Sequence, residues 1–267
     1  MKDKLILAIL QLPIVFAESE RNFAAAKEAM EAALCKSPRP DILLLPELWL
    51  TGFFPSPIEQ YAEDAVHAKE MMQTFAKMHG IYLVGGSLPI REKGAIYNRA
   101  FVFDRSGEEI AHYDKMHLFS PGGEKGVFTA GSSLATFSIE GHMAALAICY
   151  DLRFPELFRA LSACGAELVF LPAEWPLRRI DHFELLVRAR AVENQIFFAA
   201  CNGSGLFPKA IPIGGHSAVI DPWGEVLIGA KEAPAILTAA LDFERLAEAR
   251  KRITVWQDRR TDVYSSM

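Results

Sequence analysis

The sequence predicts an α/β protein built as a four-layer αββα sandwich, in which two mixed sheets pack face to face and helices cover their outer sides. Two observations lead to this fold class. Short apolar runs of strand length alternate with amphipathic helical segments along the 267 residues, and such apolar runs are typical of buried strands. The second observation is a weak internal repeat, in which four short motifs of the first half recur in the same order in the second half.

In the first half, strands are predicted where apolar residues run together, and helices where they recur every three or four positions. A strand over 5–12 is followed by an amphipathic helix over 18–34, a buried strand over 41–45 and a second helix over 62–78. Strands over 82–86 and 97–103 come next, and the DRSGE turn at 104–108 leads into another strand at Ile110. Residues 114–131 are expected to form mainly loop.

In the second half, strands over 134–139 and 143–148 precede a helix that runs from Pro155 to about Cys164. Proline suits the first helical position because the N–H that it lacks would have no partner there. A strand over 168–171, a helix over 180–194 and a strand over 196–200 follow. A hairpin over 217–228 is predicted around Asp221-Pro-Trp-Gly224, and a final helix covers 243–251.

The internal repeat places different side chains at equivalent positions. AILQ at 8–11 recurs as AICY at 147–150, and ILLLPELW at 42–49 recurs as LVFLPAEW at 168–175. IYLVGGS from Ile81 recurs as IFFAACN from Ile196, and FDRSGE from Phe103 recurs as IDPWGE from Ile220. We therefore expect two similar halves, each a sheet with helices on one face. No linker rich in glycine, serine or charge separates them, so residues 1–267 are predicted to be a single domain that ends in a tail over 252–267.

Composition and charge exclude several classes of protein. The formal net charge of −5 provides no basic surface for nucleic acid or for an anionic membrane. The apolar run near the N-terminus is short and is interrupted by Gln11 and Pro13, so it is predicted to be a core strand rather than a signal peptide. The four cysteines show no metal-binding spacing and suit a reducing compartment. These features predict a cytoplasmic protein without a metal or other cofactor.

Cys149 is the first candidate functional residue, because it follows a buried strand and precedes a helix N-terminus. Oriented N–H groups and the positive end of a helix lower the pKa of a thiol and favour the thiolate. A buried structural cysteine is the alternative interpretation. The charged residues Asp151, Arg153 and Glu156 follow closely, which argues against an inert apolar pocket.

Glu47 and Lys115 are candidates for the groups that a reactive thiol requires. In the repeat, Cys149 aligns with Leu10 and Glu47 aligns with Ala173, so each half contributes one reactive group at the carboxyl end of a strand. Alone, Glu47 is either such a group or a surface carboxylate, and Lys115 and Glu124 are unremarkable loop residues. Together they offer a base, a cation for an oxyanion and a second carboxylate, which a cysteine amidase needs.

The three motifs resemble a known family. LLLPELWLTGF around Glu47, YDKMHLF around Lys115 and ICYDLRFPE around Cys149 resemble the Glu-Lys-Cys triad of the nitrilase superfamily of carbon–nitrogen hydrolases. The similarity continues through RARAVENQ at 188–195 and the QDRRTDVY tail. The resemblance implies an αββα sandwich, a homodimer or larger homo-oligomer, and a second glutamate between the lysine and the cysteine, which Glu124 matches by position.

Within the superfamily the chain most resembles the omega-amidase branch, on the evidence of CYDLRFPE, of Trp175 after LPAE and of GE in the loop before Phe128. The resemblance implies a small carboxylate-bearing amide, such as 2-oxoglutaramate or 2-oxosuccinamate, cleaved through a cysteine thioester. The apolar segment GSGLFPKAIPIGG at 203–215 departs from that branch, where more polar character is expected. The alternatives are another amidase or carbamoyl-amide hydrolase of the superfamily, or a catalytically silent binding protein.

The resemblance also assigns roles to individual groups. Glu47 is expected to be the base, Lys115 and the backbone N–H of Tyr150 to hold the oxyanion, and Glu124 to orient the site. Arg153 is expected either to bind the substrate carboxylate or to pair with Glu156. The residues expected to form aromatic walls that limit the length of the substrate are Trp175, Phe119 and Phe207.

Other candidate sites are weaker. His112 and His117 lie five residues apart, which fits neither a helix face nor a strand face and disfavours a metal pair. A papain-like pair would need a histidine to reach Cys149, and His182 is the least unsuitable. Arg190 and Glu193 are predicted to form a structural ion pair on one helix. The tail from Arg252 to Tyr264 interleaves charged with apolar residues, which predicts docking on a surface that includes a second subunit.

Overall fold

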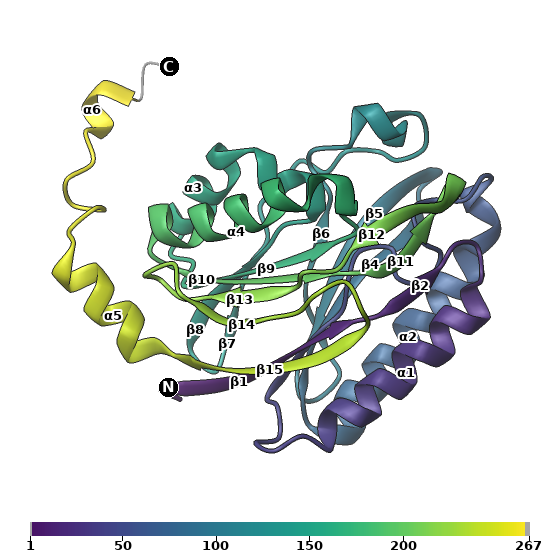
Figure 1. Ribbon diagram of the computed structural model, residues 1–267, viewed down its shortest axis with the longest axis horizontal. Coiled ribbons are helices and arrows are strands. Elements are labelled where there is room, and N and C mark those ends of the chain that lie inside the picture. Colours follow the sequence, from purple (N-terminus) through teal and green to yellow (C-terminus); the bar gives the residue numbers. More distant parts are fainter. Residues whose placement is uncertain (1, 265–267) are drawn as a thin grey trace.

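The computed structural model describes residues 2–264 and contains two six-stranded sheets that pack face to face between helices (Figure 1). The strands of the first sheet, in spatial order, are β15 (Ala235–Asp242), β1 (Lys4–Gln11), β3 (Ile42–Leu44), β4 (Tyr82–Glu92), β5 (Ala95–Phe103) and β6 (Glu109–Asp114). Those of the second are β7 (Thr136–Ile139), β8 (His142–Leu146), β9 (Leu168–Ala173), β10 (Phe197–Asn202), β13 (Ala218–Ile220) and β14 (Val226–Gly229).

The two sheets share one topology, which explains the internal repeat. In each sheet three neighbouring strands run parallel, namely β1, β3 and β4 in the first and β8, β9 and β10 in the second. An antiparallel pair of strands follows on one side, and a single antiparallel strand closes the other edge. The predicted αββα sandwich of two similar halves is therefore confirmed.

Helices cover the outer face of each sheet. The helices are α1 (Ser19–Leu34), α2 (Ala62–His79), α3 (Pro155–Ala163), α4 (Ile180–Asn194), α5 (Phe243–Arg252) and α6 (Thr261–Tyr264). Helices α1 and α2 lie outside the first sheet, and α3 and α4 outside the second (Figure 1). The one-turn 3₁₀ segments are η1 (Ile58–Tyr61), η2 (Ser120–Gly122), η3 (Glu124–Gly126), η4 (Cys149–Arg153), η5 (Leu177–Arg179) and η6 (Pro208–Ala210).

The apolar side chains of β1 divide between two cores, as expected for a strand buried on both faces. Leu7 and Ile9 pack in the cluster that fills the space between the sheets, whereas Ala8 and Leu10 pack in the cluster beneath α1 and α2. Burial on both faces explains why the parallel strands are recognisable as continuous apolar runs.

Some strands were not predicted from the sequence. A small third sheet joins β12 (Ile211–Gly214), β11 (Ser204–Phe207) and β2 (Pro13–Val15).

Strand β4 was predicted to stop at Gly86 but continues to Glu92 through an irregularity between Val84 and Ser87, where Gly86 adopts a φ of 65°. Glycine pairs therefore mark a bulge within the strand here rather than its end.

Strand β15 was also missed, because its residues are half-exposed and show no clear alternation of apolar and polar side chains. It pairs antiparallel with β1 along the whole length of both strands, so the end of the chain completes the sheet of the first half. This pairing supports the proposal that the chain is one domain. Within residues 2–264, no helix is long and apolar enough to cross a membrane.

Candidate active site

The turn that follows β3 places the carboxylate of Glu47 at the centre of the molecule, with no exposed surface. Its Oε1 accepts hydrogen bonds from Lys115 Nζ and from Asn98 Nδ2, both at 2.8 Å. Its Oε2 accepts the backbone N–H of Glu174 at 3.0 Å, across the interface between the two sheets. The surface-carboxylate interpretation of Glu47 is therefore wrong.

The backbone around Glu47 is held by the neighbouring strand β4. Leu48 adopts a positive φ of 39°, and its N–H donates to Ser87 Oγ at 2.9 Å. The indole of Trp49 donates to the carbonyl of Gly85 at 2.8 Å. A Cβ at Gly86 would lie 2.1 Å from the carbonyl oxygen of Pro46, so only glycine permits this approach.

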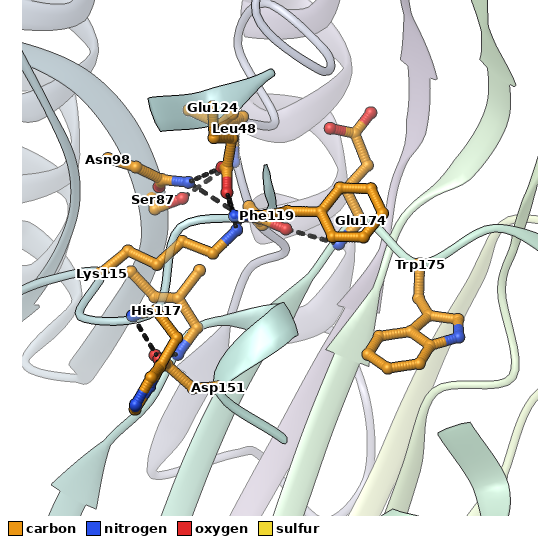
Figure 2. A network of polar contacts seen from close by, with 12 residues as sticks. Leu48, Ser87, Asn98, Lys115, His117, Phe119, Glu124, Asp151, Glu174 and Trp175 are labelled. Carbon is orange, nitrogen blue, oxygen red and sulfur yellow. Dashed lines mark hydrogen bonds and ion pairs between the residues drawn. The ribbon is translucent and has the colours of Figure 1, made fainter. Parts of the chain in front are cut away.

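Lys115 joins two glutamates in a buried cluster, which Figure 2 shows from close by. Its Nζ lies 2.8 Å from Glu47 and 2.9 Å from Glu124, and all three side chains are at most 1 % exposed. Burial acts to lower the pKa of Lys115, but the carboxylates of Glu47 and Glu124 outweigh it and raise that pKa above its ordinary value. Burial also raises the pKa of Glu124, against the opposing effect of Lys115.

Cys149 begins η4 directly after β8 and lies against the cluster. It is 7 % exposed and adopts a φ of 44°, a strained conformation for a residue with a side chain. Burial, and after it the Glu47 carboxylate, raise the pKa of the thiol well above its ordinary value, and Lys115 opposes them only in part. The prediction that a helix end lowers this pKa is therefore wrong, because α3 begins only at Pro155 and burial and the Glu47 carboxylate act in the opposite direction.

Asp151 fixes the turn that contains Cys149 through hydrogen bonds, a role that was not predicted from the sequence. Its fully buried carboxylate accepts the backbone N–H of Ile148 at 2.8 Å and the hydroxyl of Tyr113 at 2.8 Å. It also accepts the backbone N–H of His117 at 3.0 Å and lies 2.7 Å from that residue's Nδ1 (Figure 2). These contacts join the loop after Lys115 to the turn of the cysteine.

A cavity of about 630 Å³ opens above this cluster, with Lys115 and Cys149 on its floor. The four aromatic side chains that line it are Phe53, Phe119, Trp175 and Phe207. Phe53 contacts both Phe119 and Phe207 edge-to-face, at centroid distances of 6.3 and 5.6 Å. The structure thus brings the predicted aromatic residues to one cavity and adds Phe53, which comes from the loop after the Glu47 turn.

Cations surround the same cavity. The cationic residues of its wall above the floor are Arg153, Arg178, Arg179 and Lys209. The guanidinium of Arg153 lies 4.6 Å from the ring centroid of Trp175 and 3.4 Å from His182 Nδ1, so its side chain faces the cavity wall. Among the described residues that line the cavity, only Glu174 is acidic.

Asn98, Asp151 and Glu174 are the principal site residues that sequence reasoning missed. Asn98 lies within β5 and Glu174 follows β9, so nothing in their local sequence distinguishes them from structural polar residues. The repeat offered one usable signal, because Glu174 occupies the position of Leu48 and thus puts an acid where the other half has an apolar residue.

The weaker candidates have other partners. His117 contacts Asp151, and His112 pairs with Glu109 at 2.9 Å. Arg190 forms the predicted ion pair with Glu193 at 2.9 Å, and it also donates to the carbonyl of Leu152, next to the turn of the cysteine.

Residues 6–251 match the carbon–nitrogen hydrolase family. The chain belongs to that family. It is 38 % identical over 262 residues to 2-oxoglutaramate amidase of Bacillus subtilis (strain 168), covering 98 % of this chain and 100 % of that protein. It is 34 % identical over 268 residues to omega-amidase NIT2 of Homo sapiens, covering 97 % of this chain and 96 % of that protein.

The solved structure of an amidase from Nesterenkonia sp. AN1 is similar throughout. A mutant of that amidase, with acrylamide added at its active-site cysteine, gives a TM-score of 0.85 at 30 % identity over 98 % of this chain and 99 % of that chain. Another mutant was solved in complex with butyramide. These similarities confirm the predicted resemblance, the fold and the enzyme class, a hydrolase of carbon–nitrogen bonds with a cysteine nucleophile.

Proposed function

We propose that the protein hydrolyses the terminal amide of a short carboxylate-bearing acid, with 2-oxoglutaramate or 2-oxosuccinamate as the preferred substrate. The observation that carries the proposal is a cavity with Cys149 and Lys115 on its floor, two buried glutamates bonded to that lysine, and four cationic side chains along its wall. The relatives named 2-oxoglutaramate amidase and omega-amidase support it.

In the proposed mechanism, Glu47 takes the proton of the Cys149 thiol as the sulfur attacks the amide carbon. Lys115 Nζ and the backbone N–H of Tyr150 stabilise the oxyanion that forms. Glu47 then gives the proton to the departing nitrogen, so that ammonia leaves and a thioester remains. Finally Glu47 takes a proton from water, whose oxygen attacks the thioester, and gives that proton to the departing sulfur, so that the acid and the thiol are released.

The raised pKa of the thiol fits this scheme, since a neutral thiol beside a carboxylate is the starting state that a general base requires. Glu124 holds the other side of Lys115, so the ammonium group stays fixed beside the nucleophile. Asn98 donates to Glu47 and fixes the orientation of the base.

The carboxylate of the substrate is proposed to bind near Arg153, with Arg178 and Arg179 close by on η5. Arg153 forms no ion pair with Glu156 among the described contacts, and instead lies over Trp175, where its charge is available to a ligand. The aromatic walls restrict the acyl chain to a short one.

The deciding experiment compares kcat/KM for 2-oxoglutaramate with kcat/KM for the neutral amides butyramide and valeramide, with released ammonia as the readout. The proposal expects a preference for 2-oxoglutaramate of at least about 100-fold, because the neutral amides leave the cations of the cavity wall without an anionic partner. Equal values, or a preference for the neutral amides, would contradict the substrate assignment and leave only the broader assignment of amidase activity.

A neutral aliphatic amide is the second candidate substrate, and it is favoured by the butyramide complex of the amidase from Nesterenkonia sp. AN1. The same measurement separates the two candidates. A protein that releases ammonia from no amide of the panel would instead be a binding protein on the same scaffold, although the intact cluster of Glu47, Lys115, Glu124 and Cys149 argues against this.

We further propose a cytoplasmic homo-oligomer. The four free cysteines are in keeping with a reducing compartment. Beyond α5 the tail runs away from the body of the molecule (Figure 1) and is anchored by Trp256, whose indole donates to the carbonyl of Asn194 at 3.1 Å. On α4, Leu185 and Val192 are 67 % and 48 % exposed, an apolar surface that a second subunit would cover.

Light scattering on a chain truncated after Lys251 tests the contribution of the tail. A smaller assembly than that of the full chain supports the proposal. An unchanged oligomer would show that the tail lies outside the interface.

A further inference from the structure

The two oxyanion donors of the proposed mechanism come from separate segments of the chain. Lys115 directly follows β6, whereas the N–H of Tyr150 belongs to η4, directly after Cys149. An oxyanion hole is effective only when its donors are fixed about 3 Å from the place where the negative charge develops. The two segments must therefore be held at a fixed separation.

The carboxylate of Asp151 joins these segments from inside the protein. It has no exposed surface and is not among the residues that line the cavity. Its Oδ1 accepts the backbone N–H of His117 at 3.0 Å and lies 2.7 Å from that residue's Nδ1 (Figure 2). Its Oδ2 accepts the hydroxyl of Tyr113 and the backbone N–H of Ile148, both at 2.8 Å. One carboxylate thus binds three separate points of the site's backbone and side chains.

On the lysine side, these hydrogen bonds flank Lys115. Tyr113 lies two positions before it and His117 two positions after it. The Tyr113 hydroxyl also accepts the backbone N–H of Met116 at 3.2 Å. Burial, and after it the charge of Asp151, raise the pKa of Tyr113 well above its ordinary value, so the phenol remains a donor to that carboxylate. The backbone from which the lysine extends is therefore held on both sides.

On the cysteine side, Asp151 closes the turn that contains the nucleophile. Its carboxylate accepts the N–H of Ile148, and its own N–H donates to the carbonyl of Ile148 at 3.0 Å, which encloses Cys149 and Tyr150 between the two residues. The φ of 44° at Cys149 is costly for a residue with a side chain, and such strain persists only where the surrounding structure enforces it. The paired hydrogen bonds of Asp151 provide that constraint.

A histidine–aspartate pair can also serve as a proton relay to a nucleophile. The surroundings of His117 and Asp151 argue against that role. Neither residue lines the cavity, and the carboxylate that acts on the thiol of Cys149 is that of Glu47. Asp151 therefore acts on the reaction through the groups that it holds.

We propose that Asp151 is a positioning residue that fixes the separation of the two oxyanion donors, so that its loss slows turnover without weakening substrate binding. The inference rests on the roles that the proposed function gives to Lys115 and to the N–H of Tyr150, but not on which acyl chain is preferred. Because Asp151 acts through these donors, its effect on kcat should depend on whether both of them are present.

The test combines Asp151→Asn with Lys115→Met and measures kcat and KM for the best amide of the substrate panel. Asparagine has the size of aspartate, but its NH₂ group cannot accept a hydrogen bond. Asp151→Asn should lower kcat by about 10- to 100-fold and change KM by less than about threefold. In the Lys115→Met background the same substitution should lower kcat by less than about fivefold, since one of the positioned donors is already gone.

Asp221→Asn is the matched control. Asp221 is also fully buried, and it accepts the backbone N–H groups of Trp223 and Glu225, both at 2.9 Å, in the turn between β13 and β14. This variant should lower the melting temperature, as Asp151→Asn does, but leave kcat unchanged. The control therefore separates the loss of a buried carboxylate from the loss of oxyanion positioning.

A loss of kcat that is equally large with and without Lys115 would overturn the proposal, because it would show a role independent of the oxyanion donors. A loss no larger than that of Asp221→Asn, or one confined to KM, would also overturn it. If Asp151→Asn does not fold, Tyr113→Phe removes a single hydrogen bond to Asp151 and should lower kcat by about 3- to 10-fold at unchanged KM. A wild type that cleaves no amide would contradict the proposed function itself, which distinguishes that failure from an additive effect of Asp151.

Discussion

The carboxyl ends of β3 and β9 occupy equivalent places in the two sheets, yet the side chains that follow them differ in which ones reach the active site and which ones pack in the core. After β3, Glu47 reaches the centre of the site and Trp49 is fully buried in the core, with its indole on the carbonyl of Gly85. After β9, Ala173 takes the place of the acid and Trp175 faces the cavity instead.

The ends of β1 and β8 show the same contrast. Near the end of β1, Leu10 is fully buried in the core beneath α1 and α2, which is a purely structural arrangement. Cys149 follows β8 in a strained turn beside Glu47. The repeated backbone therefore provides equivalent positions, and the side chain alone determines which of them takes part in chemistry. Substitutions at equivalent positions should then affect different properties.

The largest expected effect comes from Cys149→Ala, matched with Leu10→Ala at the equivalent position. Removing the nucleophile should lower kcat by at least about 10⁴-fold while the protein stays folded. Leu10→Ala should leave kcat of the folded protein unchanged but lower the free energy of unfolding by about 2–5 kcal/mol, since Leu10 is fully buried. Ammonia release and thermal unfolding measure the two properties.

Mass spectrometry after iodoacetamide inactivation provides an independent check. The label should lie on Cys149, whereas Cys35, Cys164 and Cys201 should be dispensable for turnover. A label on another cysteine at the point of inactivation would contradict the assignment of the nucleophile.

Glu47→Gln should lower kcat by about 10²–10⁴-fold, the usual contribution of a general base. It should also change the titration of the thiol in a definite direction. Because the Glu47 carboxylate contributes to raising the pKa of Cys149, its removal should lower that pKa. The pH profile of Cys149 alkylation should therefore move to lower pH in the variant, although the variant is almost inactive. A profile that stays in place or moves upward would contradict the contact between the two groups.

Lys115→Met should lower kcat by about 10²–10³-fold, the effect of losing one oxyanion donor. It should also destabilise the protein, because two buried carboxylates lose their shared cation. Burial already raises the pKa of Glu124, and without Lys115 nothing offsets that effect, so the folded variant binds more protons than the unfolded chain and loses stability as pH rises from about 4.

The double variant Lys115→Met/Glu124→Gln separates the loss of activity from the loss of stability. It should regain much of the stability at neutral pH, because one of the two buried charges is gone, but none of the activity. Thermal unfolding at pH 5 and pH 7 measures the first property. Near-normal kcat in either variant would remove Lys115 from the mechanism.

The sequence was sufficient to predict the fold, because continuous apolar runs and four motifs that recur in the second half reflect buried strands in two similar sheets. It also led to Glu47, Lys115, Cys149 and Glu124, which the structure brings together. It did not lead to β15, whose half-exposed residues lack periodicity.

The ionisation of Cys149 was predicted wrongly from sequence for a physical reason. Local sequence indicates strand and helix ends, but the pKa of the thiol depends on burial and on a carboxylate 102 positions earlier in the chain, Glu47. Asp151 and Glu174 were missed for the same reason. Their importance lies in partners that only the packed sheets bring near.

The smallest expected effects come from substitutions of Trp49 and Trp175. These residues occupy equivalent positions after β3 and β9, so they test directly whether the two strand ends differ in role. Trp49→Phe should lower the free energy of unfolding by about 1–3 kcal/mol, because a buried indole hydrogen bond and some packing are lost, while KM stays unchanged. Trp175→Phe should mainly raise KM for the carboxylate-bearing substrate, by about 2- to 10-fold, because the Arg153 guanidinium loses the stronger cation–π partner. KM for butyramide should change less, since that amide has no carboxylate for Arg153 to bind. If both variants lose only stability, Trp175 belongs to the core as Trp49 does, and the two strand ends differ less than the structure indicates.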